Sequence, residues 1–238
     1  LSGLNDFQAD LMAQVRATSP NVEAWFGADS ANATFTGATL SPSGGGTTAF
    51  RLGGHSNTAG TFTIAGANVL RGAFPLIVGH SDANDRNYTD GVIYIPQAQG
   101  FTGSVTLGQG GVLQTGVDGS LGSARSSTIF LRTGELRLST AAGLFGGTDS
   151  QYGFRRLDVA SGTGTIRANS LGGGGFVSVA LGSIVIGDRD TSNNRVLSFR
   201  ANGGNWADFV INGVVSPNLG AAGNFFFDVG DDLSLIHI

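Results

Sequence analysis

Short alternations of apolar residues, each closed by a glycine-containing turn, fill the segment 103–139. They lie at 105–107, 112–113, 129–131 and 136–138. Strands of three to five residues are too short to form a stable open sheet by themselves, but strands stacked one above another bury a continuous core. The segment therefore predicts a stacked β architecture.

The same pattern returns along the C-terminal half. Strand-like openings fall near Ser104, Thr128, Arg156, Val177 and Val196, at intervals of 24, 28, 21 and 19 residues. A second short strand follows each opening, at 112–114, 136–138, 166–168, 184–186 and 209–211. Two strands per interval of this length are typical of a solenoid, whereas a propeller blade needs about 40 residues and four strands. We expect an all-β parallel β-helix, with equivalent strands about 4.8 Å apart.

Composition agrees with this fold and excludes several others. The chain of 238 residues has 40 Gly, 40% hydrophobic residues and only 13% charged residues, and the glycines have no three-residue period. Low charge with this apolar content argues against disorder, and the missing period excludes collagen. Cysteine is absent, which excludes disulfides, thiol catalysis and cysteine-based zinc sites. No apolar run approaches the roughly 18–20 residues of a membrane-spanning helix.

The charge pattern argues against a nucleic-acid partner. All 13 basic residues are arginines scattered along the sequence, and the net charge is −4. Nucleic-acid binding needs a clustered basic face.

The N-terminal segment has a different pattern. Apolar residues recur there at helical spacing, namely Leu4, Phe7, Leu11 and Val15, with Met12 beside them. Asn5 and Gln8 form a plausible capping pair at the start of such a helix. We expect residues 1–27 to be a capping segment whose helix covers the open end of the stack. A partner-binding amphipathic helix is the alternative.

The solenoid is expected to occupy residues 28–232. Within it, 75–78 is a compact apolar run that predicts a strand buried on both faces. The last six residues, 233–238, resemble the translation of a sequencing adapter, so we expect a non-native tail there. His237 is therefore left out of every functional interpretation.

Three segments carry a family resemblance: 101–108 (FTGSVTLG), 111–116 (GVLQTG) and 118–123 (DGSLGS). They resemble the turn, the strand and the glycine corner of the autotransporter-associated β-strand repeat, although Phe101 stands where that repeat usually has Tyr. Segments 50–54, 60–64 and 76–79 are similar to stretches that often precede such repeats. The resemblance covers about 48–232 and is strongest at 100–140. It implies a right-handed β-solenoid passenger that is secreted or displayed at the outer membrane.

One polar loop is a candidate metal site. Asp188, Asp190, Ser192 and Asn194 place oxygen ligands at alternate positions, as in the first half of a calcium loop. The following Gly is absent, and Phe199 stands where the bidentate Glu would be. A solvated turn is therefore the preferred interpretation, with no metal and no cofactor.

Catalysis is the competing hypothesis. Enzymes built on parallel β-helices cluster Asp with Arg, Lys or His on adjacent coils, and Asp158, Asp188 and Asp190 could meet in that way. Paired carboxylates can perform glycosidic acid–base chemistry. Lysine is absent, however, and His55 and His80 lie in glycine-rich, turn-like surroundings. We therefore expect no catalytic residues.

The sequence thus predicts a non-enzymatic, extracellular or surface-displayed stalk or adhesin. The expected partners are host or matrix glycans or proteins, with no nucleic acid. Membrane association is expected only through a C-terminal anchor or barrel outside this sequence. The alternative is a carbohydrate-active β-helix enzyme, either a polysaccharide lyase or a hydrolase.

Overall fold

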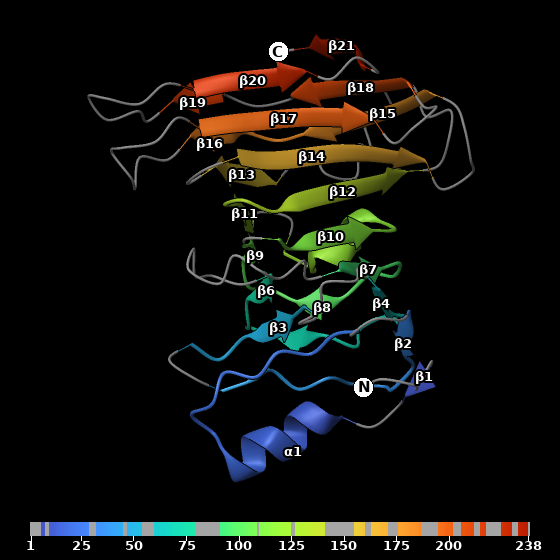
Figure 1. The fold of residues 1–238 in the computed structure, drawn as a ribbon, viewed down its shortest axis with the longest axis vertical. Helices are drawn as coiled ribbons and strands as arrows, with labels where there is room; N and C mark the ends of the chain where they lie inside the picture. The colour runs from blue at the N-terminus through green and yellow to red at the C-terminus, as the bar shows by residue number, and fades with distance from the viewer. Residues whose placement is uncertain are drawn as a thin grey trace.

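The computed structural model of the chain describes residues 6–7, 10–28, 32–44, 47–53, 60–79, 91–108, 110–124, 127–140, 155–159, 163–170, 176–186, 195–201, 206–211, 215–217, 225–229 and 233–237. In this part of the chain, strands far apart in sequence are stacked from one end of the molecule to the other (Figure 1).

Two long parallel sheets form the walls of the stack. The first, which we call the long sheet, has nine strands. In spatial order they are β1 (Asp6–Phe7), β2 (Ala33–Phe35), β4 (Thr61–Ile64), β7 (Val92–Ile95), β10 (Val112–Thr115), β12 (Glu135–Thr140), β14 (Thr163–Ser170), β17 (Arg195–Ala201) and β20 (Phe225–Val229).

The second sheet has seven strands and alternates with the first along the chain. Its strands are β3 (Phe50–Leu52), β6 (Leu76–Val78), β9 (Val105–Leu107), β11 (Thr128–Leu131), β13 (Arg156–Val159), β16 (Ile184–Ile186) and β19 (Val215–Pro217). Two smaller sheets complete the described strands: β15 (Phe176–Leu181), β18 (Trp206–Ile211) and β21 (Leu233–His237), and the pair β5 (Arg71–Gly72) and β8 (Gly100–Phe101). The fold is an all-β parallel β-helix, as the sequence predicts.

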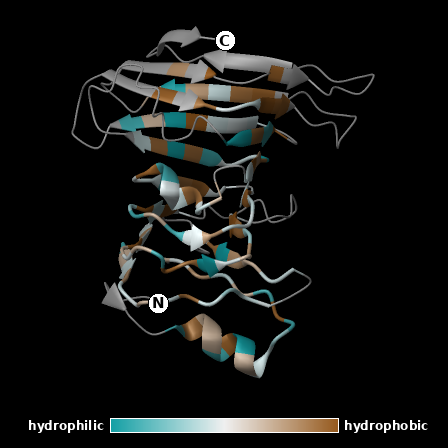
Figure 2. Cartoon of the chain, turned by 180° about the vertical axis from the view of Figure 1, so that it is seen from behind, coloured by the Kyte–Doolittle hydropathy of each residue, from teal (hydrophilic) through white to brown (hydrophobic). Residues whose placement is uncertain are grey.

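The core follows from the alternation along each strand. In the long sheet Ile93, Leu113 and Leu136 stand in register and are fully buried, while their sequence neighbours face outward. In the second sheet Val105, Ile129 and Leu157 form the facing column. Figure 2 shows the hydrophilic and hydrophobic residues alternating along the strands. Since each apolar residue stacks on its counterpart in the next coil, one core runs through the whole stack.

The predicted openings near Val177 and Val196 do not continue the series of Ser104, Thr128 and Arg156. Leu157 of the second sheet pairs with Ile184, while Val177 lies on β15 in the three-stranded sheet and Val196 lies on β17 in the long sheet. The C-terminal coils are therefore longer than the N-terminal ones, because they contain a third strand and because β14 has eight residues where β4 has four. Figure 1 shows the corresponding widening of the stack. The sequence pattern does not tell which sheet each of these strands joins, because apolar and polar residues alternate with a period of two in all of them.

The N-terminal helix begins later than predicted. Asp6 and Phe7 form β1, which pairs with β2, and helix α1 runs from Leu11 to Thr18. Asp10 caps α1 by accepting a hydrogen bond from the Ala13 amide at 3.1 Å, and its second oxygen accepts one from Ser41 Oγ at 2.8 Å. The predicted capping residues Asn5 and Gln8 lie outside the described residues.

Met12 is the buried residue of α1 and belongs to the main core cluster, so the helix packs against the N-terminal end of the stack. Within the described residues, no helix is both long enough and apolar enough to cross a bilayer.

Two other expectations concern single strands. The strand β6 is buried on one face only, because Ile77 is partly exposed between Leu76 and Val78. At the C-terminus, Leu233–His237 forms β21, which pairs with β18 across a register shift between Ala207 and Asp208. A strand position does not reveal the origin of a sequence, so the non-native tail stays a prediction.

Candidate functional site

The sequence-predicted metal and catalytic residues lie mostly outside the described structure. The residues outside the described structure are Asp188, Asp190, Ser192, Asn194, His55 and His80. In the described part of the chain, no group of three or more His, Cys, Asp or Glu residues is arranged to hold a metal ion.

Asp158 is described, and it lies on β13 between Phe130 and Val185 of the adjacent strands. Its carboxylate contacts the Arg156 guanidinium at 3.4 Å. The residues in register with Asp158 are thus apolar, and the structure places no second carboxylate opposite it on β11 or β16.

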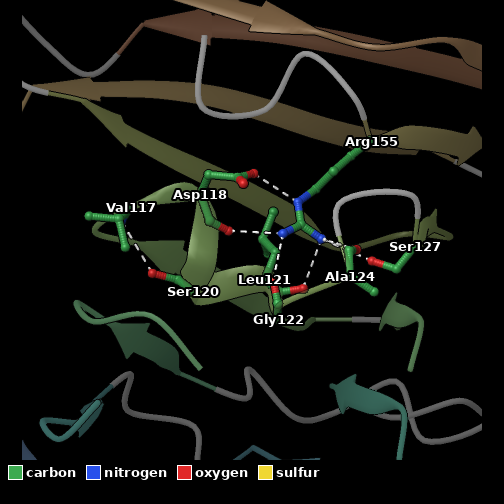
Figure 3. A network of polar contacts seen from close by, with 8 residues as sticks. All are labelled: Val117, Asp118, Ser120, Leu121, Gly122, Ala124, Ser127 and Arg155. Carbon is green, nitrogen blue, oxygen red and sulfur yellow. Dashed lines mark hydrogen bonds and ion pairs between the residues drawn. The ribbon is translucent and has the colours of Figure 1, made fainter. Parts of the chain in front are cut away.

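The most extensive polar network surrounds the buried side chain of Arg155, at the start of β13 (Figure 3). The guanidinium reaches back to the preceding corner, where the 3-10 helix η1 (Asp118–Leu121) turns the chain. Nε donates to Asp118 Oδ1 at 2.8 Å, and the terminal nitrogens donate to backbone carbonyls and one hydroxyl. These acceptors are the carbonyls of Asp118 (3.1 Å), Leu121 (3.0 Å), Gly122 (2.7 Å) and Ala124 (3.2 Å), and Ser127 Oγ (2.9 Å).

This network serves the architecture. A corner leaves backbone carbonyls without strand partners, and a planar guanidinium with five N–H donors can satisfy several of them at once. Arg155 thereby joins two successive coils. It is 3% exposed, so it is not available to an external ligand.

Two further buried side chains hold other corners in the same way. Gln99 accepts hydrogen bonds from the amides of Val69 (2.9 Å) and Leu70 (3.0 Å) and donates to the carbonyls of Gly66 (2.9 Å) and Gln97 (3.0 Å).

Arg51 donates to Glu23 Oε1 (2.7 Å), Ser43 Oγ (2.8 Å) and two backbone carbonyls. Beside it lies an open hollow of about 310 Å³, lined by Glu23, Trp25, Thr47, Arg51, Pro75, Ile77, Ser104 and Thr106. Arg51 is 3% exposed and both of its terminal nitrogens donate to protein acceptors, so this guanidinium serves the structure and is not presented to a ligand.

The outward face of the long sheet carries a different arrangement, which we call the arginine column. Arg137 on β12 pairs in register with Arg167 on β14, and Arg167 pairs with Arg200 on β17. The column continues through Gln114 on β10 to Tyr94 on β7. All five side chains are partly exposed. Among the polar groups described so far, only the arginine column extends across several adjacent strands on the outside of the protein.

Glu135 lies beside this column and contacts two of its members. Its Oε1 accepts from Arg137 Nε at 2.6 Å and from Arg167 Nε at 2.8 Å. Burial raises the pKa of Glu135, but the hydrogen bonds and charges of Arg167 and Arg137 lower it more, so the net pKa lies below the ordinary value. Glu135 is therefore ionised at neutral pH and neutralises part of the column.

The sequence interpretation treated the arginines as scattered, and the fold brings three of them together. The sequence did contain a signal for this clustering. Arg137, Arg167 and Arg200 each follow directly after an inward apolar residue, namely Leu136, Ile166 and Phe199, and these three stand in register. Recognising it required the correct pairing of β14 with β17.

Comparison of the chain with protein-family models, with curated proteins and with solved structures gives no match.

Proposed function

We propose that this chain is a non-enzymatic β-solenoid that acts outside the cell as a passenger stalk or adhesin. The observation that carries the proposal is the unbroken core of the stack. Nine strands of the long sheet follow one another in parallel, which corresponds to roughly 38 Å along the stack at the usual strand spacing. In such an architecture each coil contacts its neighbours, so length can be added without a new core.

The buried polar residues support the same interpretation. Arg155, Gln99 and Arg51 direct their hydrogen-bonding groups to corners of their own or adjacent coils. Side chains used in this way stiffen the stack, since each coil is fixed to the next by directional bonds as well as by apolar contacts. Stiffness along one axis is what a stalk requires.

Display outside the cell can be tested with one engineered cysteine. Because this sequence contains no cysteine, Val22→Cys introduces its first thiol, at a side chain that is 49% exposed, and labelling is compared with that of the unsubstituted protein. A membrane-impermeant maleimide should label this variant on intact cells that produce the full-length protein. Leu76→Cys, at a fully buried position, is the matched control and should be labelled only after unfolding.

Labelling of Val22→Cys only after lysis would contradict the proposed location. The absence of enzyme activity needs a separate measurement. Purified protein should leave the viscosity and the reducing ends of polygalacturonate and other polysaccharides unchanged. Cleavage that is lost in an Asp188→Ala, Asp190→Ala double variant would establish the enzyme alternative instead.

A further inference from the structure

The arginine column is a linear array of positive charge with a fixed spacing. Strands β12, β14 and β17 lie directly above one another in Figure 1 and pair in parallel, with Arg137, Arg167 and Arg200 in one register. Adjacent strands in a sheet are about 4.8 Å apart, so guanidinium groups recur at about that interval along the stack axis.

Within the strands that carry the array, arginines outnumber acidic residues. Across β10, β12, β14 and β17, Glu135 is the sole acidic residue, and it contacts Arg137 and Arg167 together. The next strand, β20, places Asp228 in register with Ser198, in the column beside the arginines. Like charges opposite one another on adjacent strands destabilise a sheet. An external anion would relieve this repulsion.

Part of the column's donor capacity is already used. Besides the contacts of Arg137 and Arg167 with Glu135, Arg167 Nη1 donates to the Ala201 carbonyl at 3.1 Å and Arg200 Nη1 to the Phe199 carbonyl at 3.2 Å. The side chains of Arg137 and Arg167 are still 30% and 27% exposed, so they present further N–H groups that suit oxyanions. A guanidinium binds carboxylate or sulfate groups through two parallel hydrogen bonds. Beyond the arginines, Gln114 and Tyr94 extend the same line with an amide and a phenol ring, groups that hydrogen-bond hydroxyls and pack against sugar rings.

The shape of the column favours a thin linear polymer. An extended acidic peptide presents carboxylates on one side about 6.8 Å apart, which does not match the strand spacing. Duplex nucleic acid needs a broad basic face, and this chain has a net charge of −4. In an acidic polysaccharide, one sugar residue spans close to one strand spacing and every residue can carry an anionic group.

We propose that the outward face of the long sheet, from Tyr94 to Arg200, binds an acidic polysaccharide along the solenoid axis through the arginine column. The recognised groups are carboxylates or sulfates that repeat along the polymer. This site would give the proposed adhesin its ligand class, and in that respect it rests on the proposed function.

The test uses the full chain and three immobilised polymers: polygalacturonate with carboxylates, dextran sulfate with sulfates, and neutral dextran. Binding to at least one of the acidic polymers and not to dextran is expected, and the two arms identify the preferred anion. The Arg137→Gln, Arg167→Gln double variant should weaken binding at least about tenfold, since two charge-assisted contacts are lost. Circular dichroism and thermal melting establish that each variant is folded.

Two single variants distinguish binding by the arginine column from a general effect of net charge and from an effect of unfolding. Glu135→Gln removes the competing carboxylate, so it should strengthen binding severalfold. Arg156→Gln removes one positive charge, as each of the two column substitutions does, but it lies on the second sheet, where the side chain is 51% exposed, and it should leave binding unchanged. If the double variant fails to fold, the two single variants still decide the question, because only Glu135→Gln is expected to change binding.

Four results would overturn the proposal: no binding to either acidic polymer, equal binding to neutral dextran, a loss in Arg156→Gln equal to that in the double variant, or tighter binding to duplex DNA, immobilised as a fourth polymer, than to either acidic polymer. Labelling of Val22→Cys on intact cells is independent of all four. A displayed protein that does not bind acidic polymers would refute the site and leave the proposed function standing.

Discussion

Arg155 Nε lies 2.8 Å from Asp118 Oδ1, although 37 residues separate the two in sequence. The pair links the corner of one coil to the first strand of the next. Since Arg155 also donates to four backbone carbonyls and to Ser127, it holds in place a segment with few strand hydrogen bonds of its own.

Arg155→Ala is expected to destabilise the protein by about 3–5 kcal/mol, because it removes the guanidinium that neutralises a buried carboxylate and hydrogen-bonds several buried carbonyls. Denaturant unfolding measures the loss, and amide exchange should accelerate first in η1. Arg156→Ala is the matched control, because its side chain is 51% exposed and its ion pair is worth less than about 1 kcal/mol. Equal losses in the two variants would contradict the structural role of Arg155.

Gln99→Glu tests whether the corner requires an amide. A carboxylate can still accept from Val69 and Leu70, but it cannot donate to the carbonyls of Gly66 and Gln97. The ionised group is then buried opposite carbonyl oxygens, so stability at neutral pH should fall by about 3 kcal/mol. Burial also raises the pKa of the new carboxyl, and the loss should shrink as the pH falls through that raised pKa.

Gln97→Glu makes the same chemical change two residues away, at an exposed side chain. Thermal melting of both variants between about pH 4 and pH 7 separates the two positions. A Gln99→Glu variant as stable as Gln97→Glu at neutral pH would show that the corner does not depend on the amide donors.

The core was predictable from the sequence because it depends on a local pattern. Leu136 and Leu138 alternate with polar neighbours. Parallel stacking places such residues in the core, whatever the conformation of the corners. The position of Val177 was not predictable, since a third strand with the same alternation enters the coil there and shifts the apparent period.

The polar residues illustrate the same limit more sharply. The contact between Asp118 and Arg155 depends on which coil lies above which, and no local pattern specifies it. The arginine column required the pairing of β14 with β17, since Arg167 and Arg200 gain their relation only through the register. Asp6 and Phe7 belong to β1, so the helix starts later in the sequence and Asp10 is its capping residue. The helical spacing of apolar residues includes Phe7, so the sequence pattern predicted an earlier start.

Gly103→Ala is expected to be more harmful than Gly164→Ala, because the space between coils differs at the two positions. A Cβ on Gly103 would lie 2.4 Å from the backbone of Phe74 and Pro75 in the preceding coil. The three atoms nearest to a Cβ on Gly164 all belong to the buried side chain of Leu131, with Cγ at 2.5 Å. A side chain can change its rotamer, whereas the Phe74–Pro75 backbone can move only together with its coil.

We expect a loss of at least about 2–3 kcal/mol for Gly103→Ala and a smaller loss for Gly164→Ala. Denaturant midpoints of the two variants decide this, and the reverse order would mean that the coils are less closely spaced at Gly103.

Removal of divalent metal should not change stability. The loop with Asp188 and Asp190 has neither the glycine nor the distal bidentate carboxylate of a complete calcium loop. The thermal midpoint is therefore expected to be equal in a chelator and in millimolar calcium. A lower midpoint in the chelator, restored by calcium and absent in an Asp188→Ala, Asp190→Ala double variant, would instead identify that loop as a calcium site.

Glu135 should make stability dependent on pH in the acidic range. Its pKa is lowered in the folded protein, because the hydrogen bonds from Arg167 and Arg137 outweigh the opposing effect of burial. A carboxyl with a depressed folded pKa stabilises the protein fully above its ordinary pKa, and this contribution disappears as the pH falls through the lower folded value. The wild-type protein should therefore exceed Glu135→Gln by about 1–2 kcal/mol at neutral pH and converge with it in acid.

Paired unfolding curves from neutral pH to about pH 2.5 measure this convergence, which should begin near the ordinary glutamate pKa of about 4.3. Asp158→Asn is the matched control, since that carboxylate meets one guanidinium at 3.4 Å, where Glu135 meets two at 2.6 and 2.8 Å. Its stability difference from wild type should be smaller at neutral pH. A difference for Glu135→Gln that stays constant down to the acid limit would mean that the carboxylate is not held by the two arginines, and the arginine column would then lack its internal counter-ion.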